Sequence, residues 1–253
     1  MLLECRSLGI AVSDRMLIRE LDLDVKPGQL LAILGPNGAG KTLLMQTLAG
    51  IRPATCGEVR IQDRTLRDWP TRELARRVAL LPQNIEDPFP ASVLETVLLG
   101  RHPHISRWKW EGPEDLRIAR AALAAVGLAG YEQRETLTLS GGERRRAAIA
   151  AVLAQAPALF LMDEPTNHLD PGHRLEALQL LRERADNGAG VLVSLHDPNL
   201  AARFADRVLL IDGRGDCKLG DTRDTLTAEH LAALFETGFE CLERGGRRLF
   251  FQA

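Results

Sequence analysis

The chain has 253 residues, 45% of them hydrophobic, which is enough for one large domain, or one domain with an inserted subdomain, around a substantial core. A formal net charge of −2 without any block of five like charges argues against a nucleic-acid partner. No secretory signal opens the sequence, and the longest apolar run, 147–162, is too short to span a bilayer and is interrupted by Gln155 and Pro157. We therefore expect a globular protein that reaches a membrane only through a partner.

Neither the cysteines nor the basic residues indicate a special site. The basic run Arg144–Arg146 is interpreted as the solvated face of a helix. The cysteines lie far apart without metal-ligand spacing, so we expect reduced thiols in a cytosolic protein. They are Cys5, Cys56, Cys217 and Cys241.

The first third of the chain predicts two kinds of strand. In 2–25 the apolar residues Leu21, Leu23 and Val25 alternate with charged ones, as in a half-exposed antiparallel sheet. After a turn at Pro27, the continuous apolar runs 30–34 and 78–81 are typical of buried strands, and 58–61 has the pattern of another short strand. We expect strands at 30–34, 58–61 and 78–81, and helices at 43–48 and 70–77.

The pattern changes after Gln83. Between residues 84 and 155 no strand is evident, and apolar spacing predicts helices at 93–99 and 114–126, so this segment is interpreted as a helical insert. Strands then alternate with helices, which predicts a largely parallel sheet covered on both faces. The expected strands are 158–162, 190–195, 208–211 and a last edge strand at 247–251, and the expected helices are 171–186, 198–204 and 227–235.

Residues 35–42 fit the pattern G-x-x-x-x-G-K-[ST] of a phosphate-binding loop at every fixed position. The glycines let backbone N–H groups turn inward around a polyphosphate, Lys41 neutralises the β and γ oxygens, and the Thr42 hydroxyl can bind Mg²⁺. The strand before the loop and the helix after it would direct a helix N-terminus at the phosphates. The predicted loop consists of Gly35, Pro36, Asn37, Gly38, Ala39, Gly40, Lys41 and Thr42.

Two carboxylates follow the apolar run 159–162, where a buried strand would deliver them to its C-terminal end. Downstream of a phosphate loop this arrangement indicates hydrolysis. Asp163 would hold Mg²⁺, and Glu164 would polarise the water that attacks the γ-phosphorus in line.

The stretch 139–143, Leu-Ser-Gly-Gly-Glu, opens a predicted helix. Ser140 can cap this helix, while Gly141 and Gly142 permit close backbone approach, so the stretch predicts a second anion site at a helix N-terminus. A chain with one phosphate loop needs such a site only if a nucleotide is clamped between two subunits.

In sequence order these stretches resemble the nucleotide-binding subunit of an ATP-binding cassette (ABC) transporter, and the resemblance covers nearly the whole chain. It includes a Walker A loop at 35–42, a Q-loop glutamine at Gln83, a signature at 139–143, a Walker B strand at 159–164, a D-loop at 167–170 and a switch histidine at His196. The resemblance implies one α/β ABC ATPase domain over 1–253. Segments 1–83 and 156–253 would form a P-loop NTPase core with a mostly parallel sheet and an N-terminal antiparallel β subdomain. The inserted helical subdomain would be 84–155.

The resemblance also implies a homodimer that binds two ATP molecules, each between the Walker A loop of one subunit and the signature of the other, with Mg²⁺ as a second cofactor. Gln83 would contact Mg²⁺ and couple the γ-phosphate to rotation of the helical insert. His196 would bind the γ-phosphate and orient Glu164. Asp170 would lie at the dimer interface and link the two sites.

Two stretches, 96–104 and 194–202, are similar to ABC importers of iron chelates and cobalamin. They imply a bacterial importer of a ferric siderophore, haem or vitamin B12, with this subunit bound peripherally at the cytoplasmic face of the inner membrane. The implied partners are an integral membrane permease dimer and a periplasmic or lipoprotein substrate-binding protein, with no nucleic acid.

The permease would contact this chain near its helical insert. The surface at 83–92, with Phe89 and Pro90, would form a groove for a cytoplasmic helix of the permease. His102 and His104 are interpreted as part of a loop that faces this partner rather than as metal ligands, since no third ligand lies nearby.

Two positions depart from the family pattern. Val12 stands where an aromatic residue commonly stacks on adenine, and Leu43 where a second hydroxyl residue commonly follows Thr42. We therefore expect weak discrimination between ATP and GTP, and one hydrogen bond fewer near the α-phosphate. A soluble ABC ATPase without a permease, for example in iron–sulfur cluster assembly, stays open as an alternative because its length is comparable. A P-loop kinase does not explain 139–143.

Overall fold

The computed structural model describes residues 1–84, 90–106 and 109–253. At its centre these residues form a six-stranded sheet in the order β10-β9-β3-β8-β7-β6, in which every neighbouring pair is parallel except β10 and β9. The predicted α/β fold with a mostly parallel sheet is confirmed. The strands are β3 (Leu30–Leu34), β6 (Val78–Leu81), β7 (Leu159–Met162), β8 (Gly190–Ser194), β9 (Arg207–Ile211) and β10 (Cys217–Asp221).

The central strands have continuous apolar runs because both faces of the sheet are covered. All residues of β3 are buried, and successive side chains point to opposite faces. Leu30, Ala32 and Leu34 belong to one core, which includes the helices of the insert. Leu31 and Ile33 belong to a second core, which includes α1 (Lys41–Leu48).

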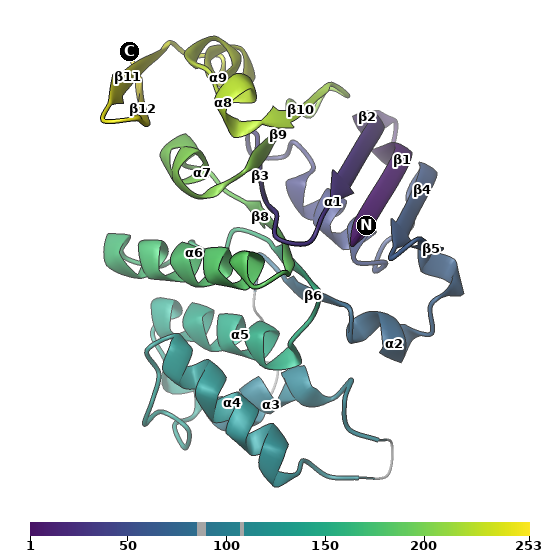
Figure 1. Cartoon of the computed structure of the whole chain (residues 1–253), viewed down its shortest axis with the longest axis vertical. Helices are drawn as coiled ribbons and strands as arrows, with labels where there is room; N and C mark the ends of the chain where they lie inside the picture. The colour runs from purple at the N-terminus through teal and green to yellow at the C-terminus, as the bar shows by residue number, and fades with distance from the viewer. Residues whose placement is uncertain (85–89, 107–108) are drawn as a thin grey trace.

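A four-stranded antiparallel sheet, in the order β2-β1-β4-β5, lies beside α1 at the N-terminal side of the molecule (Figure 1). Leu21, Leu23 and Val25 of β2 are buried and share the second core with α1, whereas Asp22 between them is exposed. The half-exposed antiparallel sheet predicted from this alternation is therefore confirmed. Its strands are β1 (Leu3–Val12), β2 (Arg15–Val25), β4 (Cys56–Ile61) and β5 (Arg64–Thr65).

Helices follow one another between Gln83 and β7, and the described part of that segment contains no strand. They pack together at the end of the molecule opposite the C-terminus (Figure 1). Ser92 caps the first of them by accepting from the backbone N–H of Glu95, and Pro113 lies in the first turn of the next. The elements are α3 (Val93–Leu98), η2 (Leu99–Arg101), α4 (Pro113–Ala125), η3 (Thr136–Thr138) and α5 (Gly141–Gln155).

The strand predicted at 247–251 is present, but not at an edge of the central sheet. It is β12 (Arg247–Gln252), which pairs only with β11 (Phe239–Arg244) among the described strands. Gly245 and Gly246 both have positive φ, and such a two-residue turn closes a hairpin on itself. The remaining elements are η1 (Leu66–Asp68), α2 (Thr71–Ala75), α6 (Pro171–Asp186), α7 (Pro198–Phe204), α8 (Thr222–Thr225) and α9 (Ala228–Phe235).

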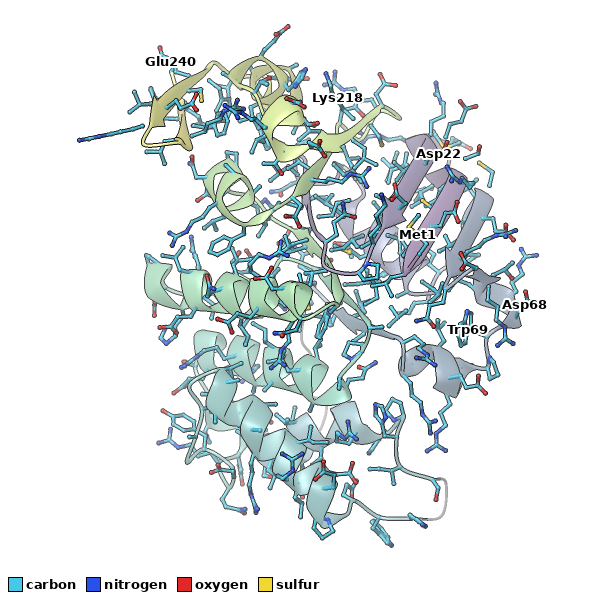
Figure 2. All side chains as sticks on the ribbon, in the orientation of Figure 1. Met1, Asp22, Asp68, Trp69, Lys218 and Glu240 are labelled. Carbon is cyan, nitrogen blue, oxygen red and sulfur yellow. The ribbon has the colours of Figure 1, made fainter. Side chains whose placement is uncertain are left out.

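Charged side chains lie on the outside of the molecule, as the exposed Asp22, Asp68, Lys218 and Glu240 illustrate (Figure 2). Within the ranges that the structure describes, no helix has both the length and the apolar character needed to cross a bilayer.

Close packing of the helical insert depends on Gly100, where a Cβ would lie 2.1 Å from the backbone oxygen of Ala151 in α5. A backbone atom cannot move aside as a side chain can. We therefore expect Gly100→Ala to lower the melting temperature by about 2–8 °C, through overpacking that costs roughly 1–3 kcal/mol. The control is Gly172→Ala, where the nearest atom is 3.4 Å away. Equal melting temperatures of the two variants in scanning calorimetry would contradict this packing.

Candidate functional site

The phosphate loop connects the C-terminal end of β3 to the first turn of α1. Gly38 and Gly40 adopt left-handed conformations, with φ of 78° and 101°, which residues with a side chain rarely adopt. Lys41 is only 5% exposed, and its ammonium group donates to the backbone oxygens of Gly35 at 2.7 Å and Pro36 at 3.1 Å. Burial lowers the pKa of Lys41, against the opposing effect of nearby carboxylates. These carbonyls are neutral acceptors, whereas a phosphate oxygen would be a charged one.

Asp163 and Glu164 follow β7 directly and are 1% and 4% exposed. The neighbouring strand β8 ends at Ser194, whose hydroxyl donates to Asp163 Oδ1 at 2.6 Å and accepts from the backbone N–H of Glu164 at 2.8 Å. Ser194 thus fixes both carboxylate residues. Ser194 was not predicted as a site residue, although a serine inside the apolar run 191–195 was a usable signal.

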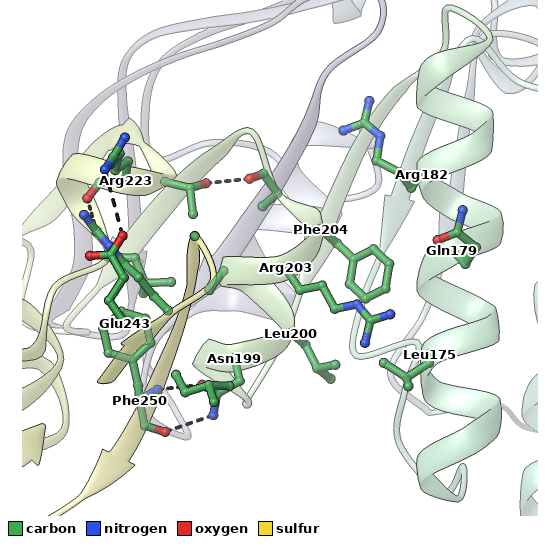
Figure 3. A pocket seen from close by; sticks show the side chains of 17 residues that line it. Leu175, Gln179, Arg182, Asn199, Leu200, Arg203, Phe204, Arg223, Glu243 and Phe250 are labelled. Carbon is green, nitrogen blue, oxygen red and sulfur yellow. Dashed lines mark hydrogen bonds and ion pairs between the residues drawn. The ribbon is translucent and has the colours of Figure 1, made fainter. Parts of the chain in front are cut away.

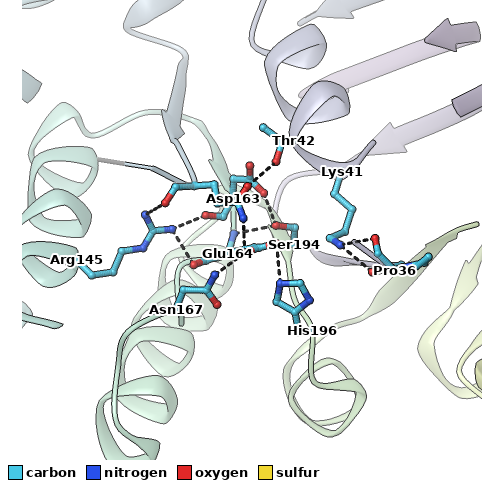
Figure 4. A network of polar contacts seen from close by, with 11 residues as sticks. Pro36, Lys41, Thr42, Arg145, Asp163, Glu164, Asn167, Ser194 and His196 are labelled. Carbon is cyan, nitrogen blue, oxygen red and sulfur yellow. Dashed lines mark hydrogen bonds and ion pairs between the residues drawn. The ribbon is translucent and has the colours of Figure 1, made fainter. Parts of the chain in front are cut away.

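The Glu164 carboxylate is the centre of a polar network (Figure 4). Its Oε1 lies 2.7 Å from His196 Nε2, and its Oε2 accepts from Gln83 Nε2 at 2.9 Å and from the Asn167 amide. Gln83 also accepts from the Thr42 hydroxyl at 3.3 Å, which joins the network to the phosphate loop. The structure therefore brings Thr42, Gln83, Glu164 and His196 together. Asn167 was not singled out as a site residue.

These groups surround a cavity of about 460 Å³. Its lining joins the phosphate loop to residues from the ends of three other strands. The residues are Asn37, Gly38, Ala39, Gly40, Lys41, Thr42, Leu43, Gln83, Glu164, Asn167 and His196.

Larger cavities lie away from this network. One, of about 930 Å³, lies between β4 and α2. Another, of about 740 Å³, lies between α6, α7 and the C-terminal hairpin, where the Asn199 amide donates to the oxygen of Phe250 and accepts from its N–H (Figure 3). A third, of about 590 Å³, is lined by α2 and by residues from 102–106 and 109–111. None of these three linings contains the phosphate loop or Glu164, so the cavity of about 460 Å³ is the better candidate site.

The signature residues do not line the cavity of their own chain. Ser140 caps α5 by accepting from the Glu143 N–H at 3.3 Å, while the Glu143 carboxylate accepts from the Ser140 N–H at 2.8 Å. Gly141 is exposed, so the helix start is accessible at this residue. Gly142 is closely packed, because a Cβ there would lie 3.1 Å from a backbone oxygen.

Asp170, the last residue of the D-loop, also lies outside the cavity. It is exposed and caps α6 by accepting from the backbone N–H of His173 at 3.0 Å, and this hydrogen bond lowers the pKa of Asp170. Its carboxylate also lies 2.6 Å from His173 Nδ1.

The interpretation of Arg144–Arg146 as a solvated face was wrong. Arg145 is 2% exposed and donates to backbone oxygens beneath the site (Figure 4). Arg146 donates to the oxygens of Val126 and Gly127, and Arg144 to that of Thr136. Helical spacing was the neglected signal, because Arg145 precedes the buried Ile149 by four residues and therefore lies on the same face of α5.

One buried oxygen of the network is suited to be a metal ligand. Asp163 Oδ2 is buried and has no hydrogen-bond partner among the described residues. A buried acceptor without a partner costs free energy, and a hard cation with oxygen ligands removes that cost. The Thr42 hydroxyl and the Gln83 side-chain oxygen, which are hydrogen-bonded to each other, would supply further oxygen ligands, so the donor set of these three residues suits Mg²⁺.

Several other predictions concern the surface. Val12, at the proposed adenine position, is 41% exposed. His104 Nε2 lies 2.8 Å from the Gln155 oxygen, and His102 lies 3.8 Å from Glu111, whereas no group of three His, Cys, Asp or Glu in the described ranges could hold a metal. Of the predicted permease groove, residues 85–89, and with them Phe89, lie outside the described residues.

Comparisons with known proteins agree with this geometry. The family model described as ABC transporter matches residues 18–167. The chain is 44% identical to the hemin import ATP-binding protein HmuV of Gloeobacter violaceus, over 94% of this chain and 87% of that protein. It is 36% identical to the iron(3+)-hydroxamate import ATP-binding protein FhuC of Bacillus subtilis, over 94% and 89%.

The solved structures that superpose on this chain include ABC transporters and their cassettes. An inward-facing structure of a metal-chelate type ABC transporter superposes with a TM-score of 0.85 and 30% identity, over 99% of this chain and 96% of that one. The dimeric ABC transporter cassette MJ0796 superposes with a TM-score of 0.75 and 27% identity, over 87% and 99%. From its motifs, its fold and these relatives, the chain belongs to the ABC transporter family, as one of its ATP-hydrolysing subunits.

Proposed function

We propose that this protein is the ATPase subunit of a bacterial importer that takes up an iron chelate, either haem or a ferric siderophore. The observation that carries the proposal is the 44% identity, over 94% of the chain, to a protein named for hemin import. A relative named for iron(3+)-hydroxamate import supports the same class of cargo. A soluble ABC ATPase without a permease is less well supported, because the relatives described above are named for import.

In this proposal the phosphate loop binds the β- and γ-phosphates of ATP. The Lys41 ammonium group exchanges its two carbonyl acceptors for phosphate oxygens, which interact more strongly with a cation. Mg²⁺, held by Thr42, Gln83 and Asp163, would neutralise charge on the phosphates.

Glu164 acts as the general base. Three side chains contact its carboxylate in the structure, which has about four acceptor sites, so the attacking water would take the remaining site on Oε1 or replace one of these side chains before the proton moves to Glu164. Gln83 and His196 both line the cavity, so each would exchange Glu164 for the γ-phosphate. Both residues would then sense whether the γ-phosphate is present.

A homodimer would complete the two sites. Ser140, Gly141, Gly142 and Asp170 lie outside the cavity of their own chain, and the related cassette MJ0796 has a dimeric structure. We place these residues at the nucleotide of the second subunit. Within each chain, 1–83 and 156–253 would form the core, and 84–155 would form the helical subdomain that moves against it.

The transporter would contain further partners. This subunit would bind peripherally to a permease dimer at the cytoplasmic face of the inner membrane, and a periplasmic or lipoprotein substrate-binding protein would deliver the chelate. The cargo never reaches the ATPase subunit, so its chemistry acts only on these partners.

We expect Glu164→Gln to lower ATP hydrolysis at least about 100-fold, because an amide cannot accept the proton, while ATP binding persists. Trapped MgATP should then convert the chain from monomer to dimer in light scattering. The matched control is Glu176→Gln, an exposed carboxylate of α6 that should hydrolyse ATP as the wild type does. Full activity of Glu164→Gln would exclude Glu164 as the base.

We expect Ser194→Ala to reduce kcat and to raise the Mg²⁺ concentration needed for half-maximal hydrolysis, each about 10-fold or more. The hydroxyl orients Asp163 and holds the Glu164 backbone, and such supporting residues tune metal affinity. Ser106→Ala, on an exposed loop, serves as the control. An unchanged Mg²⁺ dependence would count against Asp163 as the metal ligand.

The cargo is tested in cells that lack this subunit. Uptake of labelled haem, a ferric hydroxamate and cobalamin is measured after complementation with the wild type or with Glu164→Gln. We expect the wild type alone to restore uptake of haem or of the ferric hydroxamate. If cells that lack the subunit take up haem and the ferric hydroxamate as fast as complemented cells do, the importer proposal is refuted.

A further inference from the structure

Arg145 is the one residue of the described polar network that reaches the catalytic loops from the helical insert. It lies on α5, five positions after Ser140, so about 7–8 Å of rigid helix separates it from the signature serine. Any displacement of this helix start therefore moves the guanidinium group as well.

All five N–H groups of this guanidinium have backbone acceptors, in two segments. After β6, Nη1 donates to Pro82 O at 2.7 Å and Gln83 O at 3.2 Å. After β7, Nη2 donates to Glu164 O at 2.8 Å and to Asp163 O, and Nε donates to Pro165 O at 3.4 Å. Only arginine supplies five donors in one plane, so the residue type fits the place.

The two segments carry the side chains that meet at the site, Gln83 and Glu164. Glu164 has a φ of 50°, a left-handed conformation that is costly outside glycine. Its backbone N–H is held by Ser194 and its oxygen by Arg145. The strained conformation of the base therefore depends on a residue of α5.

The charge of Arg145 is buried behind the two carboxylates. Burial lowers the pKa of Arg145 to about 10, which leaves the group protonated at neutral pH. Among the described residues its hydrogen-bond acceptors are all backbone carbonyls, and no carboxylate forms an ion pair with it. Arg101, the other buried arginine of the insert, instead pairs with Asp115 and with Ala154 O inside the insert itself.

We propose that Arg145 is a positioning residue that transmits the placement of the signature helix to Gln83 and Glu164 of the same chain. The inference rests on the proposed function, in which the signature contacts the nucleotide bound to the partner subunit. Binding at one nucleotide would thereby set the geometry of the base at the other, so that the two half-sites hydrolyse ATP as a coupled pair.

The test is steady-state ATP hydrolysis by the purified full chain, with MgATP affinity measured separately by calorimetry. We expect Arg145→Gln to lower kcat about 10-fold or more, because small misplacements of a base are costly, while the affinity for MgATP changes less than about threefold. Arg145→Lys, which keeps the charge and three donors, should recover part of kcat. Arg146→Gln, one position along the same helix, should keep the wild-type kcat.

A double-mutant cycle with Ser140→Ala separates coupling from support. If Arg145 transmits the placement of the signature, the double variant Ser140→Ala/Arg145→Gln should lose little more kcat than the more damaging single variant. Arg146→Gln combined with Ser140→Ala should lose no more than Ser140→Ala alone. Should Arg145→Gln fail to fold, the same cycle is measured with Arg145→Lys.

Two results would overturn the proposal: a kcat within about threefold of wild type in the Arg145 variant, or losses that multiply independently in the cycle. Glu164→Gln is measured in parallel to separate the two hypotheses. If Glu164→Gln is inactive while the Arg145 variant is active, the coupling is refuted and the proposed function stands. If Glu164→Gln hydrolyses ATP normally, the proposed function itself fails.

Discussion

The hydrogen bonds around the Glu164 carboxylate are the constraint on which the site depends. Side chains at positions 83, 167 and 196 reach this carboxylate, and Ser194 and Arg145 hold its backbone. These groups come from separate segments of the chain, so the network exists only when the sheet and the helices beside it have assembled. Loss of any one segment would remove a hydrogen bond from Glu164, whose charge is costly to leave without partners because the residue is only 4% exposed.

The order of the parallel strands explains why these segments meet. β3, β8, β7 and β6 are neighbours, and the phosphate loop, Ser194, Asp163 and Gln83 each lie at or just after the C-terminal end of one of them. Parallel strands present their C-terminal ends along a single edge, and ligands bind at that edge in open α/β sheets. The buried alternation of β3 fixes this arrangement, because a shift of one residue would exchange the two cores.

The helical insert contributes in a different way. Its helices are hydrogen-bonded to one another, as the buried Arg101 shows by donating to Asp115 and to the oxygen of Ala154. In addition, α5 reaches the catalytic residues, because Arg145 donates to the backbone oxygen of Glu164. The same helix begins with the signature residues, which do not line the cavity of their own chain. In the proposed homodimer, α5 would be the physical link between the nucleotide bound to the partner subunit and the catalytic base of this chain.

The sequence alone determined the fold class, the phosphate loop and the family, because these depend on local order: fixed glycine and lysine spacing, strand-length apolar runs and motifs in a set succession. It also predicted that Gln83, Glu164 and His196 would lie together. Ser194, Asn167 and Arg145 were decided only by the tertiary structure. A serine, an asparagine and an arginine have ordinary solvated roles nearly everywhere. Only the folded chain buries Ser194 and Arg145 against residues distant in the sequence, and only the turn after β7 brings the Asn167 amide back onto the Glu164 carboxylate.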